Sequence, residues 1–183
     1  WGLALHPSKP EYCTVGDDKT VRVWDLNTHR LIKMTKLNEM ARAVAYSPDG
    51  SLIAVGLGGS VGRGKRKFDG AFEVLVEADL TSVYRGHESH EWIQDVKFSP
   101  DGNTLAIGSH DNKIYLHSAA DWSVRGKCEA HNSYITHFDF SEDGTAIQSN
   151  CGAYELLYFS TETGEQNASG ASDYKDLTWA SET

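Results

Sequence analysis

The sequence predicts an all-β fold made of about four consecutive four-stranded antiparallel sheets, arranged as blades and forming part of a larger propeller. Three observations support this prediction. One short apolar block recurs five times along the chain, a tight turn follows most of its copies, and neighbouring copies are separated by a nearly constant distance. A period of about 40–45 residues is typical of four-stranded propeller blades.

The recurring block is expected to form the first strand of each blade. It reads apolar, any residue, aromatic or apolar, then usually Ser or His, as in Val44-Ala45-Tyr46-Ser47. The fourth residue of the five copies falls at His6, Ser47, Ser99, Ser141 and Ala180, so the gaps are 41, 52, 42 and 39 residues. Three of these four gaps lie close to the length of one blade.

A turn follows the block in the second, third and fourth repeats. It reads Ser-Pro-Asp-Gly at Ser47–Gly50 and Ser99–Gly102, and Ser-Glu-Asp-Gly at Ser141–Gly144. Pro presets the backbone for a turn, Asp accepts a hydrogen bond from its own backbone, and Gly adopts positive φ. Second strands are therefore expected directly after these turns, at Leu52–Gly56, Leu105–Ser109 and Ala146–Ser149.

Two further strands complete each blade. We predict third strands at Thr20–Trp24, Ala71–Leu75, Lys113–His117 and Glu155–Phe159. We predict fourth strands at about Arg30–Met34, Ser82–Arg85, Ser123–Lys127 and Glu165–Ala168. The blades then occupy residues 1–38, 39–88, 89–130 and 131–172, and residues 173–183 begin a further blade with a strand near Leu177–Trp179. The chain is accordingly expected to be a segment of a longer protein.

The second repeat contains an insertion between its second and third strands. The turn Asp lies 12 residues after the block in two repeats, at Asp18 and Asp111, whereas Asp69 lies 22 residues after Ser47. The insertion holds four cations: Arg63, Lys65, Arg66 and Lys67. They form either a solvated connection or an electrostatic contact for an acidic partner surface, and we take them as candidate partner contacts.

The same insertion carries the pattern G-x-x-x-x-G-K at Gly59–Lys65. A phosphate-binding loop also requires Ser or Thr next, and a helix that begins there. Here Arg66 follows, and another strand is expected after Phe68. We therefore predict no nucleotide site and no cofactor. Since no nucleophile motif is present either, we predict that the protein is not an enzyme.

Composition narrows the range of partners. The chain has 183 residues and a net charge of −9, from 17 basic and 26 acidic side chains. This acidic average argues against nucleic acid as the partner, and no apolar run approaches the roughly 20 residues that span a membrane. Three cysteines without C-x-x-C spacing are expected to be buried thiols in a reducing compartment. Eight histidines lack Cys or carboxylate partners at ligand spacing, so we predict no metal site.

Two tryptophans lie outside the predicted strands. Most aromatic side chains fall on strands at repeat positions and are expected in the core, but Trp92 and Trp122 stand in connections. Trp is enriched among the residues that dominate protein interfaces. These two side chains are therefore the other candidate partner contacts.

Several residues resemble the WD-repeat family. Trp24-Asp25 ends a third strand as the family's Trp-Asp pair does, and Gly86-His87 and Ala130-His131 stand where the family has Gly-His. The family links a His, a strand Ser, a turn Asp and the Trp by hydrogen bonds within each blade. The positions that match this set are Asp18, Trp24, His87, Ser109, Asp111, His131 and Ser149.

The matching set is incomplete in the repeats. His117 and Phe159 occupy positions where the family has Trp, and Ala153 occupies a position where it has Asp. Each net hydrogen bond would add only about 1 kcal/mol. We therefore expect packing, rather than this network, to hold the blades.

A closer resemblance is to the echinoderm microtubule-associated protein-like (EMAP-like) family. It is carried by stretches that cover the chain nearly end to end: Trp1–Pro7, Ala106–Asn112, Tyr134–Ser141, Gln148–Leu156 and Asp176–Ala180. The most specific is Asn150-Cys151-Gly152-Ala153-Tyr154-Glu155, because generic WD repeats have the Asp turn there. The resemblance implies two joined propellers in the longer protein and binding to tubulin or microtubules, in some members in cilia.

Two functions remain open on the sequence. The first is a non-enzymatic scaffold that binds microtubules or tubulin, located in the cytoplasm and cytoskeleton and, as the resemblance suggests, in the cilium or axoneme. The alternative is a generic WD-repeat adaptor that assembles a signalling or ubiquitin-ligase complex through protein–protein interaction. The alternative requires only the propeller, since a fold by itself does not specify a function.

Overall fold

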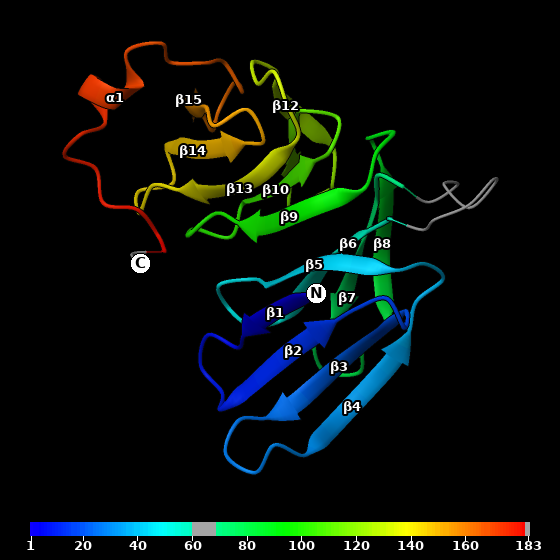
Figure 1. Ribbon diagram of the computed structural model, residues 1–183. Coiled ribbons are helices and arrows are strands. Elements are labelled where there is room, and N and C mark those ends of the chain that lie inside the picture. Colours follow the sequence, from blue (N-terminus) through cyan, green and yellow to red (C-terminus); the bar gives the residue numbers. More distant parts are fainter. Residues whose placement is uncertain (60–68, 182–183) are drawn as a thin grey trace.

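Nearly all of the regular structure is antiparallel β-sheet. The computed structural model of the chain describes residues 1–59 and 69–181, in which four sheets follow one another along the sequence (Figure 1). The first sheet contains β1 (Gly2–Leu5), β2 (Glu11–Val15), β3 (Thr20–Asp25) and β4 (Leu31–Lys36). The second contains β5 (Ala41–Tyr46), β6 (Leu52–Leu57), β7 (Ala71–Val76) and β8 (Ser82–His87). The third contains β9 (Ile93–Phe98), β10 (Thr104–Ser109), β11 (Ile114–Ser118) and β12 (Val124–Cys128), and the fourth contains β13 (Ile135–Phe140), β14 (Ala146–Cys151) and β15 (Leu156–Ser160).

The sheets are arranged as blades. Within each sheet the strands pair in sequence order, and all pairs are antiparallel. The first strands of successive sheets, β1, β5, β9 and β13, lie side by side, and the later strands of each sheet fan away from them (Figure 1). This is the arrangement of propeller blades around an axis, so the predicted fold class is confirmed.

The core consists of three apolar clusters, each between two successive sheets. Pairs that represent the three clusters are Val23 with Ile53, Phe72 with Leu105, and Leu116 with Phe140. The sheets in the middle are covered on both faces, which explains why their strands are apolar at nearly every position. All six residues of β10 are buried.

The predicted turns form as expected. Gly50, Gly102 and Gly144 have φ values of 74°, 74° and 73°, the left-handed region that only glycine enters without strain. The Ser that starts each turn accepts a hydrogen bond from the backbone N–H five residues later, as Ser47 Oγ does from Leu52 at 2.9 Å. The same bonds recur in the third and fourth sheets, so the Ser side chain closes each turn onto the second strand.

A buried carboxylate links the first two sheets. Glu77, in the turn after β7, is 4% exposed and pairs with Lys9 at 2.8 Å and with Lys33 of β4. Burial alone would raise the pKa of Glu77, but hydrogen bonds from Lys33 and Lys9 lower the pKa below its ordinary value. The carboxylate is therefore held in its charged form between the two sheets.

The fourth sheet differs from its prediction. The segment predicted as a fourth strand, Glu165–Ala168, makes a single bridge between Gln166 and Phe159. The side chain of Asn167 accepts a hydrogen bond from the backbone of Ser169, and the carbonyl of Asn167 accepts one from Gly170. These bonds turn the chain away from the sheet and into the short helix α1 (Gly170–Asp173).

The last described segment is also less regular than predicted. The strand expected near Leu177–Trp179 is reduced to one bridge, between Trp179 and Ser141 beside β13. Two backbone bonds flank that bridge, from Glu142 to the Thr178 carbonyl and from Ala180 to the Phe140 carbonyl. In the described parts of the chain, no helix has the length and apolar character needed to cross a membrane.

Candidate protein-binding face

One face of the molecule carries a row of stacked side chains that crosses all four sheets. Its first step is Arg42 of β5, whose Cζ lies 4.6 Å from the ring centroid of Trp1 and 4.8 Å from that of Trp92. The guanidinium also pairs with Asp17 at 3.3 Å. Each cation–π contact stabilises such an arrangement by about 0.5–2 kcal/mol, so the cation holds two indole rings in fixed positions.

The row continues into the third and fourth sheets through His110. Its ring meets Trp92 edge-on at 4.3 Å and stacks on Tyr134 at 4.5 Å, with the ring planes 16° apart. Burial, with a further contribution from the charge of Arg42, lowers the pKa of His110 to about 4. The imidazole is thus neutral at pH 7. We call Trp1, Arg42, Trp92, His110 and Tyr134 the aromatic ladder.

The repeat explains why these residues meet. Trp92 lies seven residues before Ser99, and Tyr134 lies seven residues before Ser141, so both stand just ahead of a first strand. The first strands lie side by side, and their starts therefore share one face. The insertion also leaves from this face: a Cβ atom at Gly59 would lie 2.3 Å from the Trp92 ring. Its four candidate contacts, Arg63, Lys65, Arg66 and Lys67, lie outside the described residues.

The ladder ends beside an open pocket of about 500 Å³ in the fourth sheet. Tyr134 and Tyr154 line this pocket. Tyr154 stands in the turn after β14 with a φ of 62° and a relative exposure of 99%. A left-handed backbone costs a bulky residue about 1–2 kcal/mol, and a side chain this exposed gains little packing in return. Lys19 and Asn112 stand at the same turn position in the first and third sheets and also have positive φ, 61° and 72°, so the left-handed backbone is a feature of the repeat.

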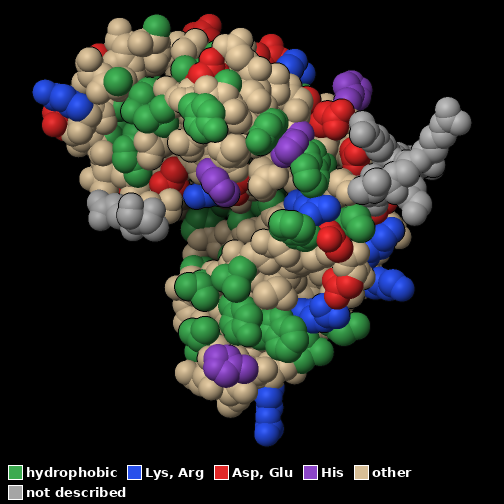
Figure 2. Space-filling model, in the orientation of Figure 1, with side chains coloured by type: hydrophobic (Ala, Val, Ile, Leu, Met, Phe, Trp, Pro, Cys, Tyr) green, Lys and Arg blue, Asp and Glu red, His purple; other side chains and the backbone are tan. Residues whose placement is uncertain are grey.

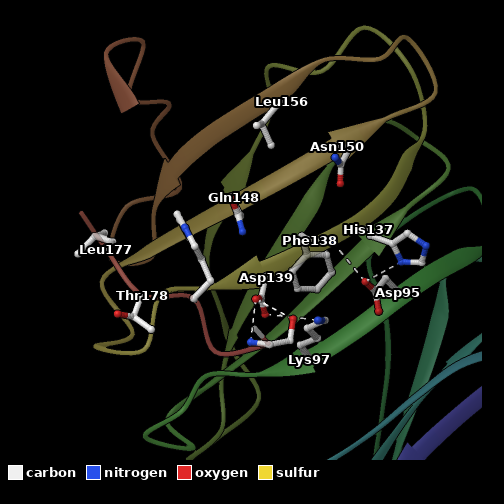
Figure 3. A pocket seen from close by; sticks show the side chains of 12 residues that line it. Asp95, Lys97, His137, Phe138, Asp139, Gln148, Asn150, Leu156, Leu177 and Thr178 are labelled. Atoms are coloured by element: carbon white, nitrogen blue, oxygen red, sulfur yellow. Dashed lines mark hydrogen bonds and ion pairs between the residues drawn. The ribbon is translucent and has the colours of Figure 1, made fainter. Parts of the chain in front are cut away.

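A larger pocket of about 1020 Å³ lies at the first strands β9 and β13 (Figure 3). Two ion pairs lie within it: His137 with Asp95 at 3.5 Å, and Lys97 with Asp139 at 3.4 Å. Asp139 also accepts two hydrogen bonds from Ser181, at 2.9 and 2.8 Å. The charged side chains that line this pocket are therefore paired with one another, and Asp139 also holds Ser181 near the end of the described chain.

The space around the first strands is open to solvent. A neighbouring pocket of about 520 Å³ is lined by residues of β1, β5, β9 and β13, and Figure 2 shows the molecule hollowed between its upper and lower halves. Apolar side chains also gather over the sheet β1–β4 in this view. Leu3, Leu5 and Met34 belong to this sheet and are 63%, 62% and 54% exposed.

The two tryptophans singled out from the sequence have different environments. Trp92 is part of the aromatic ladder. Trp122 lies in the turn between β11 and β12, where its ring stacks on Tyr84 of β8 at 5.7 Å. Trp122 therefore packs the third sheet against the second, and its role as a partner contact stays a prediction.

The first sheet keeps part of the hydrogen-bond set expected from WD repeats. The indole Nε1 of Trp24 donates to Thr14 Oγ1 at 2.9 Å, so Thr takes the place of the strand Ser. Asp18 accepts a bond from the Thr20 hydroxyl at 2.9 Å and pairs with Arg22. These contacts, with Thr20 as the largest cause, lower the pKa of Asp18.

In the third sheet a serine replaces the expected histidine. Ser89 Oγ lies 2.6 Å from Ser109 Oγ and donates to Asp111 at 2.8 Å, and the Tyr115 hydroxyl donates to the same carboxylate at 2.6 Å. His87 instead bonds the Asp69 carbonyl at 2.7 Å. The Gly-His dipeptide predicted that His87 belongs to the network, but Ser89, two residues later, takes that place.

The fourth sheet has a network with a different acid. His131 Nε2 lies 2.7 Å from Ser149 Oγ, as the repeat predicts. Glu155 lies 3.5 Å from the other ring nitrogen, and so fills the place that Ala153 leaves empty. Modified networks are thus present in three sheets, and the expectation that packing rather than the network holds the blades stays a prediction.

Comparison with known proteins agrees with this architecture. Residues 1–183 match the family model described as the echinoderm microtubule-associated protein second beta-propeller. The chain is 39% identical to the ciliary WD repeat-containing protein ctxp80 of Euplotoides octocarinatus over 98% of its length, which is 27% of that protein. It is 36% identical over its whole length to echinoderm microtubule-associated protein-like 2 of Rattus norvegicus, covering 27% of it.

A similar match is found with the 77 kDa echinoderm microtubule-associated protein of Strongylocentrotus purpuratus, at 36% identity over 100% of this chain and 26% of the relative. The chain thus spans about a quarter of the length of these curated relatives. The family match covers residues 1–183, and the strands of the described residues extend from Gly2 to Ser160. The chain therefore belongs to the echinoderm microtubule-associated protein family, within its second β-propeller.

Proposed function

We propose that this chain is a non-enzymatic scaffold module that binds microtubules or tubulin. The observation that carries the proposal is family membership over residues 1–183. Relatives over the whole chain are named as microtubule-associated proteins, and one is named as ciliary. We further propose that the protein is located in the cytoplasm at the cytoskeleton, including the cilium or axoneme.

The aromatic ladder supports this proposal as the contact surface. Trp, Tyr and Arg are the residues most enriched among interface hot spots. Trp1 and Tyr134 are 79% and 43% exposed, whereas the Arg42 side chain is only 12% exposed. Arg42 thus positions the two indole rings, and Tyr134 at the other end of the ladder presents a partly exposed ring to a partner. Stacking fixes the rings before binding, which reduces the entropy lost on association.

Co-sedimentation of the full-length protein with polymerised tubulin, compared with its sedimentation without tubulin, tests the proposal. The wild-type protein is expected in the pellet, and the double variant Trp1→Ala, Tyr134→Ala should bind at least about tenfold more weakly, as loss of hot-spot residues does. The matched control is Val83→Ala with Val124→Ala, two exposed apolar residues of outer strands. Equal binding by ladder and control variants would remove the ladder from the contact surface.

The four cations of the insertion add a second test. In the full-length protein, mutating Arg63, Lys65, Arg66 and Lys67 together to Ser should weaken binding by about fourfold to several hundredfold, since four exposed charge pairs at about 0.2–1 kcal/mol each sum to about 0.8–4 kcal/mol. The salt dependence should also flatten, because such contacts are screened beyond about 8 Å at physiological salt. Unchanged affinity at low salt would identify the insertion as a solvated connection.

The adaptor function is distinguished by the same assay. A folded wild-type protein that neither sediments with microtubules nor binds soluble tubulin dimers would overturn the proposed function. The alternative function, a WD-repeat adaptor that assembles other proteins, would then remain.

A further inference from the structure

We propose that His131, Cys151 and Glu155 form a binding site for a borderline divalent cation, Zn²⁺ in particular. The three side chains meet in the fourth sheet, close to the turn that carries Tyr154. One donor atom of each residue, a ring nitrogen, a thiol sulfur and a carboxylate oxygen, lies within 4.8 Å of the other two. Nitrogen, sulfur and oxygen donors of this kind are the ligands that zinc accepts in proteins.

The donor spacing suits a tetrahedral ion. Zinc bonds of about 2.0–2.3 Å at tetrahedral angles place ligand atoms about 3.3–3.6 Å apart. The ring Nδ1 of His131 lies 3.5 Å from Glu155 Oε2, and the sulfur of Cys151 lies 3.1 Å from the same oxygen. The His131 nitrogen and the Cys151 sulfur lie within 4.8 Å of each other, so the thiol has to move away from the oxygen and toward the imidazole for all three donors to reach zinc-binding distances.

An unsatisfied buried atom points into the site. The side chain of His131 is fully buried, and its Nδ1 makes no regular hydrogen bond among the described residues, only the 3.5 Å contact with the Glu155 carboxylate. The other ring nitrogen faces Ser149 Oγ at 2.7 Å. When that nitrogen carries the proton, Nδ1 presents a lone pair toward a carboxylate and a sulfur. A cation between them satisfies all three donors at once.

The surroundings provide support and access. Asn132 donates to both carboxylate oxygens of Glu155, from its backbone N–H at 3.0 Å and from its side chain at 2.5 Å. Ser149 orients the imidazole in the same way, and outer contacts of this kind fix ligands in metal sites. Cys151 and Glu155 line the open pocket of about 500 Å³, so water can reach the ion and complete its coordination.

Metal binding here is linked to a proton. The thiol of Cys151 must lose its proton to bind as thiolate, and that proton passes to solvent, while neutral imidazole and carboxylate bind without loss. One proton is thus released per ion, and affinity should increase with pH. No oxidant or reductant is required, because Zn²⁺ does not change its oxidation state.

Titration of the full metal-free chain with Co²⁺ and then Zn²⁺ tests the site. Co²⁺ should produce a thiolate-to-cobalt charge-transfer band that saturates at about one ion per chain. Added Zn²⁺ should then displace the Co²⁺ and remove the band, because Zn²⁺ binds sites of N, O and S donors more tightly than Co²⁺ does. Cys151→Ser should abolish the band. Glu155→Gln keeps an oxygen acceptor but loses the charge, and should weaken Zn²⁺ binding by about tenfold or more.

The other thiols supply the control. Cys13 and Cys128 are also free and buried, but neither belongs to a cluster of metal-ligating groups among the described residues. Cys128→Ala should leave the cobalt band unchanged. Circular dichroism of each variant without metal establishes that the fold is kept. Absence of the band in the wild-type chain, or its persistence in Cys151→Ser, would overturn the proposal.

Discussion

A single buried side chain, Glu77, shows how charge ties the first two sheets together. The carboxylate is enclosed and contacts Lys9 and Lys33 from the first sheet. Glu77→Gln should cost about 1–3 kcal/mol of unfolding free energy at pH 7, the range for hydrogen bonds to charged groups. Urea unfolding measures this loss.

The same residue predicts a dependence on pH. The folded-state pKa of Glu77 is lowered, so its contribution is fully present above the unfolded value near pH 4.3 and is lost as pH falls through the folded value. The difference between wild type and Glu77→Gln should therefore shrink in acid. Glu129→Gln, in an exposed pair with Lys113, is the control and should unfold like the wild type. A pH-independent difference would contradict this assignment.

A substitution at Tyr154 can distinguish an effect on stability from an effect on binding. Asn tolerates positive φ better than Tyr, so Tyr154→Asn should leave the chain equally stable or stabilise it by up to about 1 kcal/mol. If the exposed ring contacts a partner, the same variant should bind microtubules more weakly. Thermal unfolding and co-sedimentation of one preparation measure both. A loss of stability would show that the ring packs within the fold.

At the level of strands, close packing between paired strands of one sheet depends on small residues, as at the Phe72–Gly86 pair of β7 and β8. A Cβ atom at Gly86 of β8 would lie 2.2 Å from the ring of Phe72, which is 1% exposed. Gly86→Ala should therefore destabilise the chain by about 1–3 kcal/mol, the usual cost of overpacking. Gly16→Ala is the matched control, because its nearest atom lies at 3.6 Å. Equal midpoints in urea would show that β8 moves away without cost.

Strands and turns were predictable because their signals are local. The Asp-Gly turns fix where the second strands begin, and the observed β6, β10 and β14 start within one residue of expectation. The networks were less predictable, since Ser89 and Glu155 replace the expected residues from positions two residues away. Trp92 could be singled out from its place in a connection, but the ladder as a whole could not be predicted, because Trp1, Arg42 and Trp92 become neighbours only through the fold.

On the scale of the whole molecule, the first sheet exposes several large apolar side chains on its outer face. Cross-strand pairing places Leu3, Thr14, Arg22 and Met34 in one row of that face. Exposed apolar patches promote association, so the chain of 183 residues should be oligomeric or poorly soluble. Leu3→Lys with Met34→Lys should shift it toward monomer in gel filtration. A wild-type monomer at all concentrations would contradict this.

The division of the core into three clusters has a consequence for how the chain loses structure. Each cluster joins only adjacent sheets, so coupling runs between nearest neighbours, as in a one-dimensional array of repeats. Among the described residues of this chain taken by itself, the second and third sheets each have two such neighbours, and the first and fourth have one. Opening should accordingly begin at the ends and move inward, and amide hydrogens of β6 and β10 should exchange last.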